Sequence, residues 1–529
     1  MRETDAADEL TAGLNSLHIA QYRGLSQEQP AEPPKTFADL DTDAVELIVR
    51  LLPSCYDVAR VAGANRALRD AARVAAVARI AATPVPLPSD EPSHGPALLR
   101  LRAVHWAEAV AARRPHALGA GNRHSVALRA PGDSRPACSY EWGTKAPRSD
   151  AVGVLEPMAV TPDGGFGGAG ATAVEVSAGD VHVLLLDSNG DVWTWGYDGR
   201  SGRLGHGANT THVVARPEKI ELPSDSGPRP GEPRLYLPGG WPPVVLQVAA
   251  GGVHSLFLDA RGRVLACGDN CHSQLGFGDT GPETKRRVAT ALPPGVVGGR
   301  RVVQIAAGGT HIAAICEAGA VWTWGDGACG KLGHGNERRY ARPHRVERFV
   351  AMKVRVREVS AGGRHTLAVT TNSELFGWGS NALGQLGLAQ GSDFSKRNLN
   401  DFCLPTLVEV GDAQTTVQSA SAGEEHSLVL SDKGKVYAMG DNSNGVLGLG
   451  SRGKQKYIIS EPTPVMFFAP VTEIAAGGKH SLARDRKGHT HSWGCGTGGA
   501  LGSGDTEDSD IVLPILDLAP LPEMGGPLE

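Results

Sequence analysis

Short apolar runs alternate with glycine-rich turns along most of this chain, and one such stretch recurs many times. The clearest copy, residues 305–333, has the sequence IAAGGTHIAAICEAGAVWTWGDGACGKLG. Each of the last six copies passes from an Ala-Gly-x-x-His segment through two apolar runs to a glycine-rich loop that ends in Leu-Gly. The copies span residues 117–143 (a degenerate first copy), 176–205, 248–276, 305–333, 359–387, 420–448 and 474–502. Seven copies of one unit indicate a repeat architecture.

The elements within a unit are predicted to be strands. The apolar runs are short, rich in β-branched and aromatic residues and bounded by glycine. Tight turns such as Asn189-Gly190 and Lys433-Gly434 separate two of the runs, and glycine supplies the positive φ that these turns need. A further strand, opened by proline, is expected after the Leu-Gly loop, at residues 343–346 and 464–468 for example.

Units of roughly 55 residues with a few strands each fit radial repetition around an axis. We therefore predict an all-β fold, with residues 117–518 forming a seven-bladed β-propeller. The first copy has no proline-led strand before it, whereas an apolar segment, 511–516, follows the last Leu-Gly. This terminal strand is expected to close the ring against the first blade, because an unpaired edge favours aggregation.

These repeats resemble those of the regulator of chromosome condensation family, which share the A-G-x-x-H, W-G and L-G positions. The resemblance covers about three quarters of the chain and implies the propeller fold, but one fold hosts many functions. Ultraviolet-B photoreceptors with these repeats place tryptophans just after the glycine of A-G. Here those positions hold no tryptophan, which disfavours a photoreceptor; they are Asn122, Asp180, Gly252, Gly309, Gly363, Glu424 and Gly478.

The chain before the repeats has a different character. Residues 1–36 are polar, and a disordered or loosely ordered tail is expected there. Residues 37–82 carry three short runs of helical periodicity, which predict a small α-helical module. The proline-rich stretch 83–96 predicts an extended linker, and 97–116 predicts a helix that braces the module against the ring. Residues 519–529 are expected to be a tail.

Residues 37–82 resemble an F-box, the segment that docks onto the Skp adaptor of cullin ubiquitin ligases. Phe37 stands at its opening, although the usual opening proline and the tryptophan of the third helix are missing. The other interpretation is a helical cap that packs on the propeller. The resemblance implies contact with the adaptor through Leu40, Ile48, Leu51 and Leu52.

Composition narrows the classes of function. The chain has 52 basic and 57 acidic residues, a net charge of −5 and no long block of like charge, so no direct nucleic-acid binding is expected. It has no apolar run long enough for a membrane span and no apolar signal core, so a cytoplasmic or nuclear location is expected. The eight cysteines form no C-x-x-C pair and are expected to be reduced thiols.

One histidine recurs in every copy. In the last six copies it precedes a glycine by fourteen residues; the first pair is five residues longer. A residue reused in each blade does not make one asymmetric constellation, so these histidines are predicted to be structural hydrogen-bonding groups. We predict no catalytic residue, metal or cofactor, and no enzyme. The histidines are His124, His182, His254, His311, His365, His426 and His480.

The two variable residues of each A-G-x-x-H turn are the candidate binding residues. If each turn lies at one end of an inner strand, these residues gather at the mouth of the propeller, where loops on a rigid scaffold carry binding. The alternative is a set of solvated charges. A second candidate is an insertion, residues 223–243, with Tyr236 and Trp241; the alternative there is a surface insert without a partner. The charged turn residues are Arg123, Asp180, Arg364, Glu424, Glu425 and Lys479.

Three functions follow from these expectations. The first is a non-enzymatic adaptor whose propeller binds a protein and whose F-box-like module presents it to a ubiquitin ligase. The second is a guanine-nucleotide exchange factor for a Ran-like small GTPase. Resemblance to the Ran exchange factor implies a GTPase-facing role for Asp180, although Val253 stands where that factor has another acid. The third is a scaffold with no link to a ligase.

Overall fold

The computed structural model describes residues 116–128, 139–144, 154–160, 172–207, 213–223, 245–388, 401–450 and 457–515. The expected tails, the helical module and the linker lie outside the described residues, as does the predicted bracing helix apart from residue 116. The same holds for the insertion beyond residue 223. The candidate residues Leu40, Ile48, Leu51, Leu52, Tyr236 and Trp241 therefore lie outside as well.

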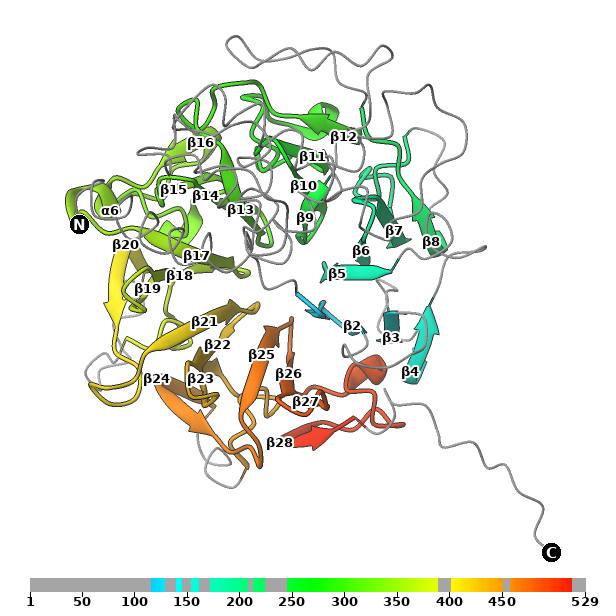
Figure 1. Cartoon of the computed structure of the whole chain (residues 1–529), viewed down its shortest axis with the longest axis vertical. Coiled ribbons are helices and arrows are strands. Elements are labelled where there is room, and N and C mark those ends of the chain that lie inside the picture. The colour runs from blue at the N-terminus through cyan, green and yellow to red at the C-terminus, as the bar shows by residue number, and fades with distance from the viewer. Residues whose placement is uncertain are drawn as a thin grey trace, which may run out of the picture. The chain divides into compact units, whose positions relative to one another are not determined.

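The described residues form seven antiparallel four-stranded sheets arranged around a common axis (Figure 1). This confirms the predicted all-β, seven-bladed propeller. The strands of blades 1 to 3 are β1 (Leu118–Ala120), β2 (His124–Leu128), β3 (Ser139–Gly143), β4 (Val154–Val160), β5 (Ala173–Ala178), β6 (His182–Asp187), β7 (Val192–Tyr197), β8 (Val213–Lys219), β9 (Val245–Ala250), β10 (His254–Asp259), β11 (Val264–Gly268) and β12 (Arg286–Ala291).

Each blade uses four strands that are consecutive in the chain, and the first of them lies innermost (Figure 1). The strands of blades 4 to 7 are β13 (Val302–Ala307), β14 (His311–Cys316), β15 (Val321–Gly325), β16 (Tyr340–Arg345), β17 (Val356–Ala361), β18 (His365–Thr370), β19 (Leu375–Ser380), β20 (Asp401–Val408), β21 (Val417–Ala422), β22 (His426–Ser431), β23 (Val436–Asp441), β24 (Ile458–Val465), β25 (Val471–Ala476), β26 (His480–Asp485), β27 (Thr490–Gly494) and β28 (Ser509–Pro514). Short helices η3 (Pro282–Thr284), η4 (Ala328–Gly330), α6 (Glu347–Ala351) and η7 (Thr497–Gly499) lie in connections.

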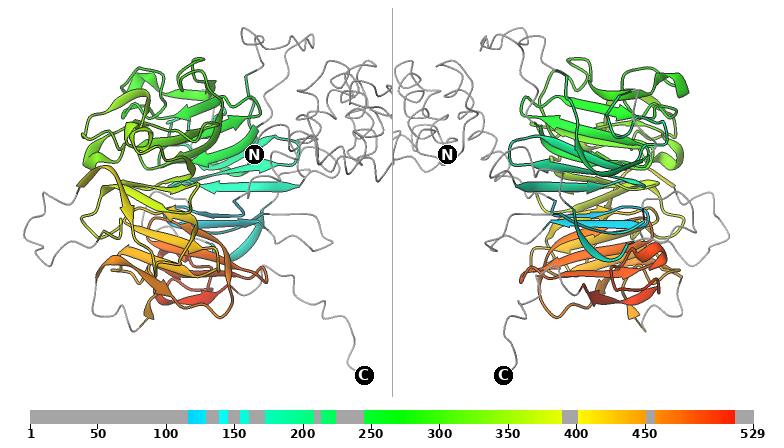
Figure 2. Two further views of the ribbon diagram at one scale, coloured as in Figure 1. Left: turned by 60° about the vertical axis from the view of Figure 1, so that its left-hand side comes forward. Right: turned by 90° about the vertical axis from the view of Figure 1, so that its right-hand side faces the viewer.

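The second strand of each blade is buried on both faces. Every residue of β10, β14 and β18 is buried, because a neighbouring blade packs against each side of the sheet. This explains why these strands are continuous apolar runs in the sequence rather than alternating ones. Viewed from the side, consecutive blades lie next to one another along the ring (Figure 2).

The turns between the second and third strands have the expected geometry, with one substitution. Gly190 has φ 82° and Gly434 has φ 76°, the left-handed region that glycine enters without a steric penalty. In blade 5 the chain has Asn372-Ser373 instead, and Ser373 adopts φ 63°. A serine in this region is uncommon, so the hairpin hydrogen bonds hold it there.

Two strand predictions were wrong in detail. The outer strands of blades 4 and 6 begin at Tyr340 and Ile458, so Pro343 and Pro464 lie inside them rather than at their starts. Proline is tolerated there because no further strand pairs with the outer edge of a blade.

The predicted closure of the ring by the terminal strand was also wrong. Strand β28 pairs with β27 of its own blade, and blade 1 has an outer strand of its own, β4. The ring closes instead through side chains and turns. Oε1 of Glu473 accepts hydrogen bonds from the backbone N–H groups of Ala117 and Leu118 at 2.6 and 2.9 Å, and Trp142 Nε1 donates to the Ala500 carbonyl at 2.9 Å. The strand that ends at the alanine of each Ala-Gly pair is the inner strand of its own blade, so every blade is complete and none needs a strand from the end of the chain.

Hydrogen bonds through a histidine and a hydroxyl link neighbouring blades at five of the seven contacts between blades, which we call seams. In blade 5 the Nε2 atom of His365 lies 2.8 Å from Ser427 Oγ of blade 6, and that hydroxyl donates to the Gln385 carbonyl of blade 5 at 2.6 Å. Since the one hydroxyl proton goes to the carbonyl, the imidazole must donate from Nε2. The same arrangement joins His480 to Ser125, His182 to Ser255, His311 to Thr366 and His426 to Ser481.

Two seams lack this hydroxyl. The residue that follows the histidine is Val183 in blade 2 and Ile312 in blade 4, where other blades carry serine or threonine. As a result, neither ring nitrogen of His254, in blade 3, has a hydrogen-bond partner among the described residues. Where the hydroxyl is present, the histidine bonds to it rather than directly to a strand carbonyl. The hydroxyl in turn donates to a carbonyl of the histidine's own blade.

The buried histidines are neutral. Burial in the seams lowers the pKa of His254 and His480 to about 4 and that of His365 and His426 to about 3. An imidazole that took up a proton here would carry an unpaired charge into an apolar seam, which is unfavourable.

The glycine of each A-G pair is fixed by contact with the next blade. A Cβ on Gly308 would lie 2.5 Å from the Gly362 carbonyl oxygen and 2.6 Å from Cε1 of His311. A Cβ on the next residue, Gly309, would find its nearest atom at 3.5 Å, which is an ordinary contact. At this turn the first glycine is therefore required by packing, whereas Gly309 has room for a side chain.

We predict that Gly308→Ala lowers the free energy of unfolding by about 1–3 kcal/mol, because the blades must separate to admit the methyl group. Gly309→Ala is the matched control and should change it by less than about 0.5 kcal/mol. Urea denaturation of both variants checks this. Equal stabilities of the two variants would contradict the close approach of the blades.

We also predict that stability falls as the pH is lowered from 7.5 to 5.5. Unfolded histidines take up protons near pH 6.5, whereas the seam histidines have lowered pKa values and stay neutral in the folded state. Each such histidine then contributes a slope of up to about 1.4 kcal/mol per pH unit below pH 6.5. Urea denaturation across this range measures the slope. His365→Gln should reduce the slope by up to about 1.4 kcal/mol per pH unit, the contribution of one proton. A free energy of unfolding that does not change with pH would show that the seams accept charge.

Candidate protein-binding surface

The variable residues of the A-G-x-x-H turns form a ring around the axis, which we call the turn ring. Backbone hydrogen bonds join successive turns: Gly309 N–H donates to Gly362 O at 3.1 Å and Gly478 N–H donates to Gly121 O at 2.9 Å. The turns follow the inner strands that surround the axis in Figure 1. The turn ring consists of residues 122–123, 180–181, 252–253, 309–310, 363–364, 424–425 and 478–479.

An arc of glycines separates two acidic side chains of the turn ring. In blades 3, 4 and 5 the first residue of each turn-ring pair is a glycine, namely Gly252, Gly309 and Gly363, which has no side chain. A Cβ on Gly252 would lie 3.1 Å from Asp180 Oδ2, and one on Gly363 would lie 2.8 Å from Glu424 Cδ. The two carboxylates therefore lean over this arc from its two ends.

Both carboxylates hold their protons more tightly than usual. Burial raises the pKa of Asp180, and the charge of Arg203 opposes this shift. Burial in the concave mouth also raises the pKa of Glu424, and the neighbouring charges of Asp180 and Glu425 raise it further, while Arg364 lowers it. Asp180 and Glu424 thus repel each other across the mouth of the propeller. A cation placed between them would offset this repulsion and stabilise both carboxylates in their charged form.

Two cations that the sequence analysis missed reach the same region. Arg203 is nearly buried, and its Nη1 donates to the Gly252 carbonyl at 3.2 Å. Lys331 is buried and pairs with Asp326. Their charges act on Asp180 and Glu424 respectively. The signal was present in the sequence, because both residues directly precede Leu-Gly where other copies have glutamine, valine or alanine.

Basic side chains of the turn ring meet at the seam between blades 7 and 1. Arg123 and Lys479 line a small cleft of about 200 Å³ at the seam between blades 7 and 1, together with Asn122, Asn444 and Thr497. Neither Arg123 nor Lys479 forms an ion pair within the described residues. The ring therefore has acidic side chains in blades 2 and 6 and basic ones at the seam of blades 7 and 1.

The predicted charged residues thus share one ring but do not form one cluster. Arg364 is exposed in blade 5, beside the acidic pair, and Glu425 is half-buried next to Glu424. Among the described residues, no group of three or more histidine, cysteine, aspartate or glutamate side chains is placed to hold a metal ion. Of the helices that can be described, none is long and apolar enough to cross a membrane.

The sequence matches known proteins over most of the propeller. The family model of the RCC1-like domain matches residues 154–518. The chain is 30% identical over 401 residues to the ultraviolet-B receptor of Arabidopsis thaliana, covering 74% of this chain and 80% of that protein. It is 31% identical over 322 residues to the human E3 ubiquitin-protein ligase HERC2, covering 60% of this chain and 6% of that protein. It is 28% identical over 349 residues to the regulator of chromosome condensation of Xenopus laevis, covering 63% of this chain and 74% of that protein.

Solved structures show the same fold. The crystal structure of Prp20p from Saccharomyces cerevisiae, described with its binding properties to Gsp1p and histones, is similar with a TM-score of 0.59 and 26% identity, over 73% of this chain and 87% of that one. Human WBSCR16 is similar in fold, with a TM-score of 0.57 and 24% identity over 74% of this chain and 89% of that one. From the repeats, the seven sheets and these matches together, the chain belongs to the RCC1-like domain family.

Proposed function

We propose that this chain is the substrate-recognition subunit of an F-box-type ubiquitin ligase. In this proposal the turn ring binds a protein and residues 37–82 dock onto a Skp adaptor. The observation that carries the first part is the turn ring itself, a backbone fixed by hydrogen bonds that presents acidic side chains in blades 2 and 6 and basic ones at the seam of blades 7 and 1 between them. A fixed surface loses little entropy on binding, and separated charges favour one orientation of the partner.

The link to a ligase rests on the F-box resemblance of residues 37–82. The similarity of the propeller to the E3 ubiquitin-protein ligase HERC2 supports it, because the same kind of repeat occurs in a protein of ubiquitin ligation. Leu51 and Leu52 are the apolar side chains proposed to contact the adaptor. Fold similarity alone would not favour a ligase over other functions.

We predict that the full chain retains a purified Skp adaptor in a pull-down and that Leu51→Asp and Leu52→Asp each abolish the retention. Each substitution would place an unpaired charge in an apolar interface. Lys479→Asp is the control and should retain the adaptor fully, because Lys479 belongs to the turn ring. Absence of binding, or binding that tolerates both aspartates, would leave a scaffold without a ligase link.

A second candidate is guanine-nucleotide exchange on a Ran-like small GTPase. The position of Asp180 beside the open glycine arc favours it, as does the similarity to Prp20p, which is described with its binding to Gsp1p. In this candidate Asp180 contacts the GTPase and distorts its nucleotide site without covalent chemistry. Val253 in the next blade offers no second acid, so Asp180 would act with Glu424 instead.

We predict for this candidate that catalytic amounts of the chain speed release of labelled GDP from Ran. Asp180→Ala should slow that release by about tenfold or more, as expected for a charged contact at the centre of an interface. Asp505→Ala, a change of an exposed acid in the loop before β28, should have no effect. Release at the intrinsic rate with the unmodified chain would exclude exchange on Ran.

A further inference from the structure

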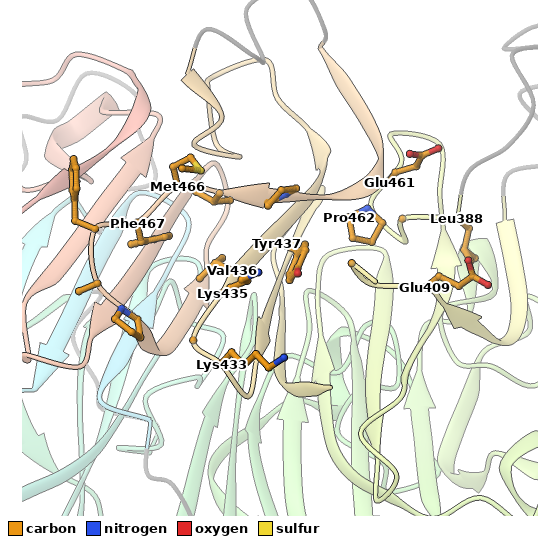
Figure 3. Close-up of a pocket in the computed structure, with 18 of the residues that line it drawn as sticks. Leu388, Glu409, Lys433, Lys435, Val436, Tyr437, Glu461, Pro462, Met466 and Phe467 are labelled. Carbon is orange, nitrogen blue, oxygen red and sulfur yellow. The ribbon is translucent and has the colours of Figure 1, made fainter. Parts of the chain in front are cut away.

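A large groove lies on the outer side of the propeller, where blades 5 and 6 meet, and none of the residues that line it belongs to the turn ring. It has a volume of about 1270 Å³ and is lined by β20, β23, β24 and the segment that follows β24 (Figure 3). Tyr437 and Val436 of β23 form its floor. Its volume exceeds the roughly 300–1000 Å³ of a small-molecule pocket, which favours a longer ligand.

The segment after β24 presents apolar side chains to solvent from a fixed backbone. Phe467 packs against Trp493 and His491, with ring centroids 5.7 Å apart in both cases. Its neighbours Met466 and Phe468 are 68% and fully exposed. Because Phe467 is anchored in the core, this exposure is not that of a loose loop. Leu407 of β20 adds a further exposed apolar side chain on the blade 5 side.

The groove carries charges of both signs at separate places. Glu409 and Glu461 are exposed at the blade 5 end, whereas Lys433 and Lys435 are exposed beside Val436 and Tyr437, between those acids and the segment that follows β24 (Figure 3). Within the described residues none of the four forms an ion pair. Two acids and two bases at separate places suit a ligand with the reverse order of charge. They do not suit an anionic membrane surface, which would require a uniformly basic patch.

The edge of β24 is unsuited to pairing with another strand. It contains Pro462 and Pro464, which lack the N–H that a strand ladder needs. A ligand would therefore be held mainly by its side chains in the groove. This favours a ligand that combines an apolar anchor with charged side chains.

We infer that the groove between blades 5 and 6 binds a peptide segment of a partner protein, with an apolar anchor over Tyr437, Met466 and Phe468. The peptide carries lysine or arginine on the side of Glu409 and Glu461. It carries aspartate or glutamate on the side of Lys433 and Lys435. This site is separate from the turn ring, so the inference does not rest on the proposed function.

Selection from a random-peptide display library on the full chain tests this inference. The expected consensus is an apolar residue followed by acidic and then basic residues, or the same order reversed. Met466→Ala combined with Phe468→Ala should weaken a selected peptide about tenfold or more, because two exposed anchors are lost. Glu218→Lys, on β8 of blade 2, is the control and should leave the affinity unchanged.

Charge reversal tests the two charged parts of the peptide separately. Selection on Glu409→Lys with Glu461→Lys should enrich acidic residues at the peptide positions that were basic. Selection on Lys433→Glu with Lys435→Glu should enrich basic residues at the peptide positions that were acidic. Lack of enrichment, a consensus that ignores these reversals, or equal weakening by Glu218→Lys overturns the inference. So does a dimer of the chain that Met466→Ala with Phe468→Ala converts to a monomer, because the groove would then bind a second copy. Thermal melting confirms that each variant is folded.

Discussion

The close approach of consecutive blades is the constraint on which the rest of the structure depends. At each A-G-x-x-H turn the glycine lies so near the carbonyl of the next blade that a side chain has no room, as Gly308 and Gly362 show. This contact sets the distance at which the histidine of one blade meets the hydroxyl of the next. It also places the fully buried tryptophans of the third strands, such as Trp378, between the blades.

The same contact separates positions that hold the ring from positions that vary. The first glycine and the histidine of each turn are buried in the seams, whereas the two residues between them lie on the turn ring. Side chains such as Asp180, Glu424, Arg123 and Lys479 can therefore differ between blades while the seams are kept. Function in such a repeat protein depends on the residues in which the copies differ.

The turn ring and the groove offer two different kinds of surface. The turn ring is charged, and partial loss of hydration raises the pKa values of Asp180 and Glu424. The groove combines apolar side chains with two acids and two bases. A protein that bound a folded partner at the turn ring would still have the groove free for a peptide, because the two surfaces share no residue.

The sequence by itself determined the number of blades, the hairpin turns and the burial of the histidines, because local strand patterns repeat with fixed spacing. It also placed the charged residues on a common ring. Tertiary structure alone decided that β28 stays in its own blade, that Arg203 and Lys331 reach the mouth, and that Met466 and Phe468 flank an anchored Phe467. These features depend on tertiary contacts, such as those of Phe467 with Trp493 and of Arg203 with Gly252, which leave no periodic trace in the chain.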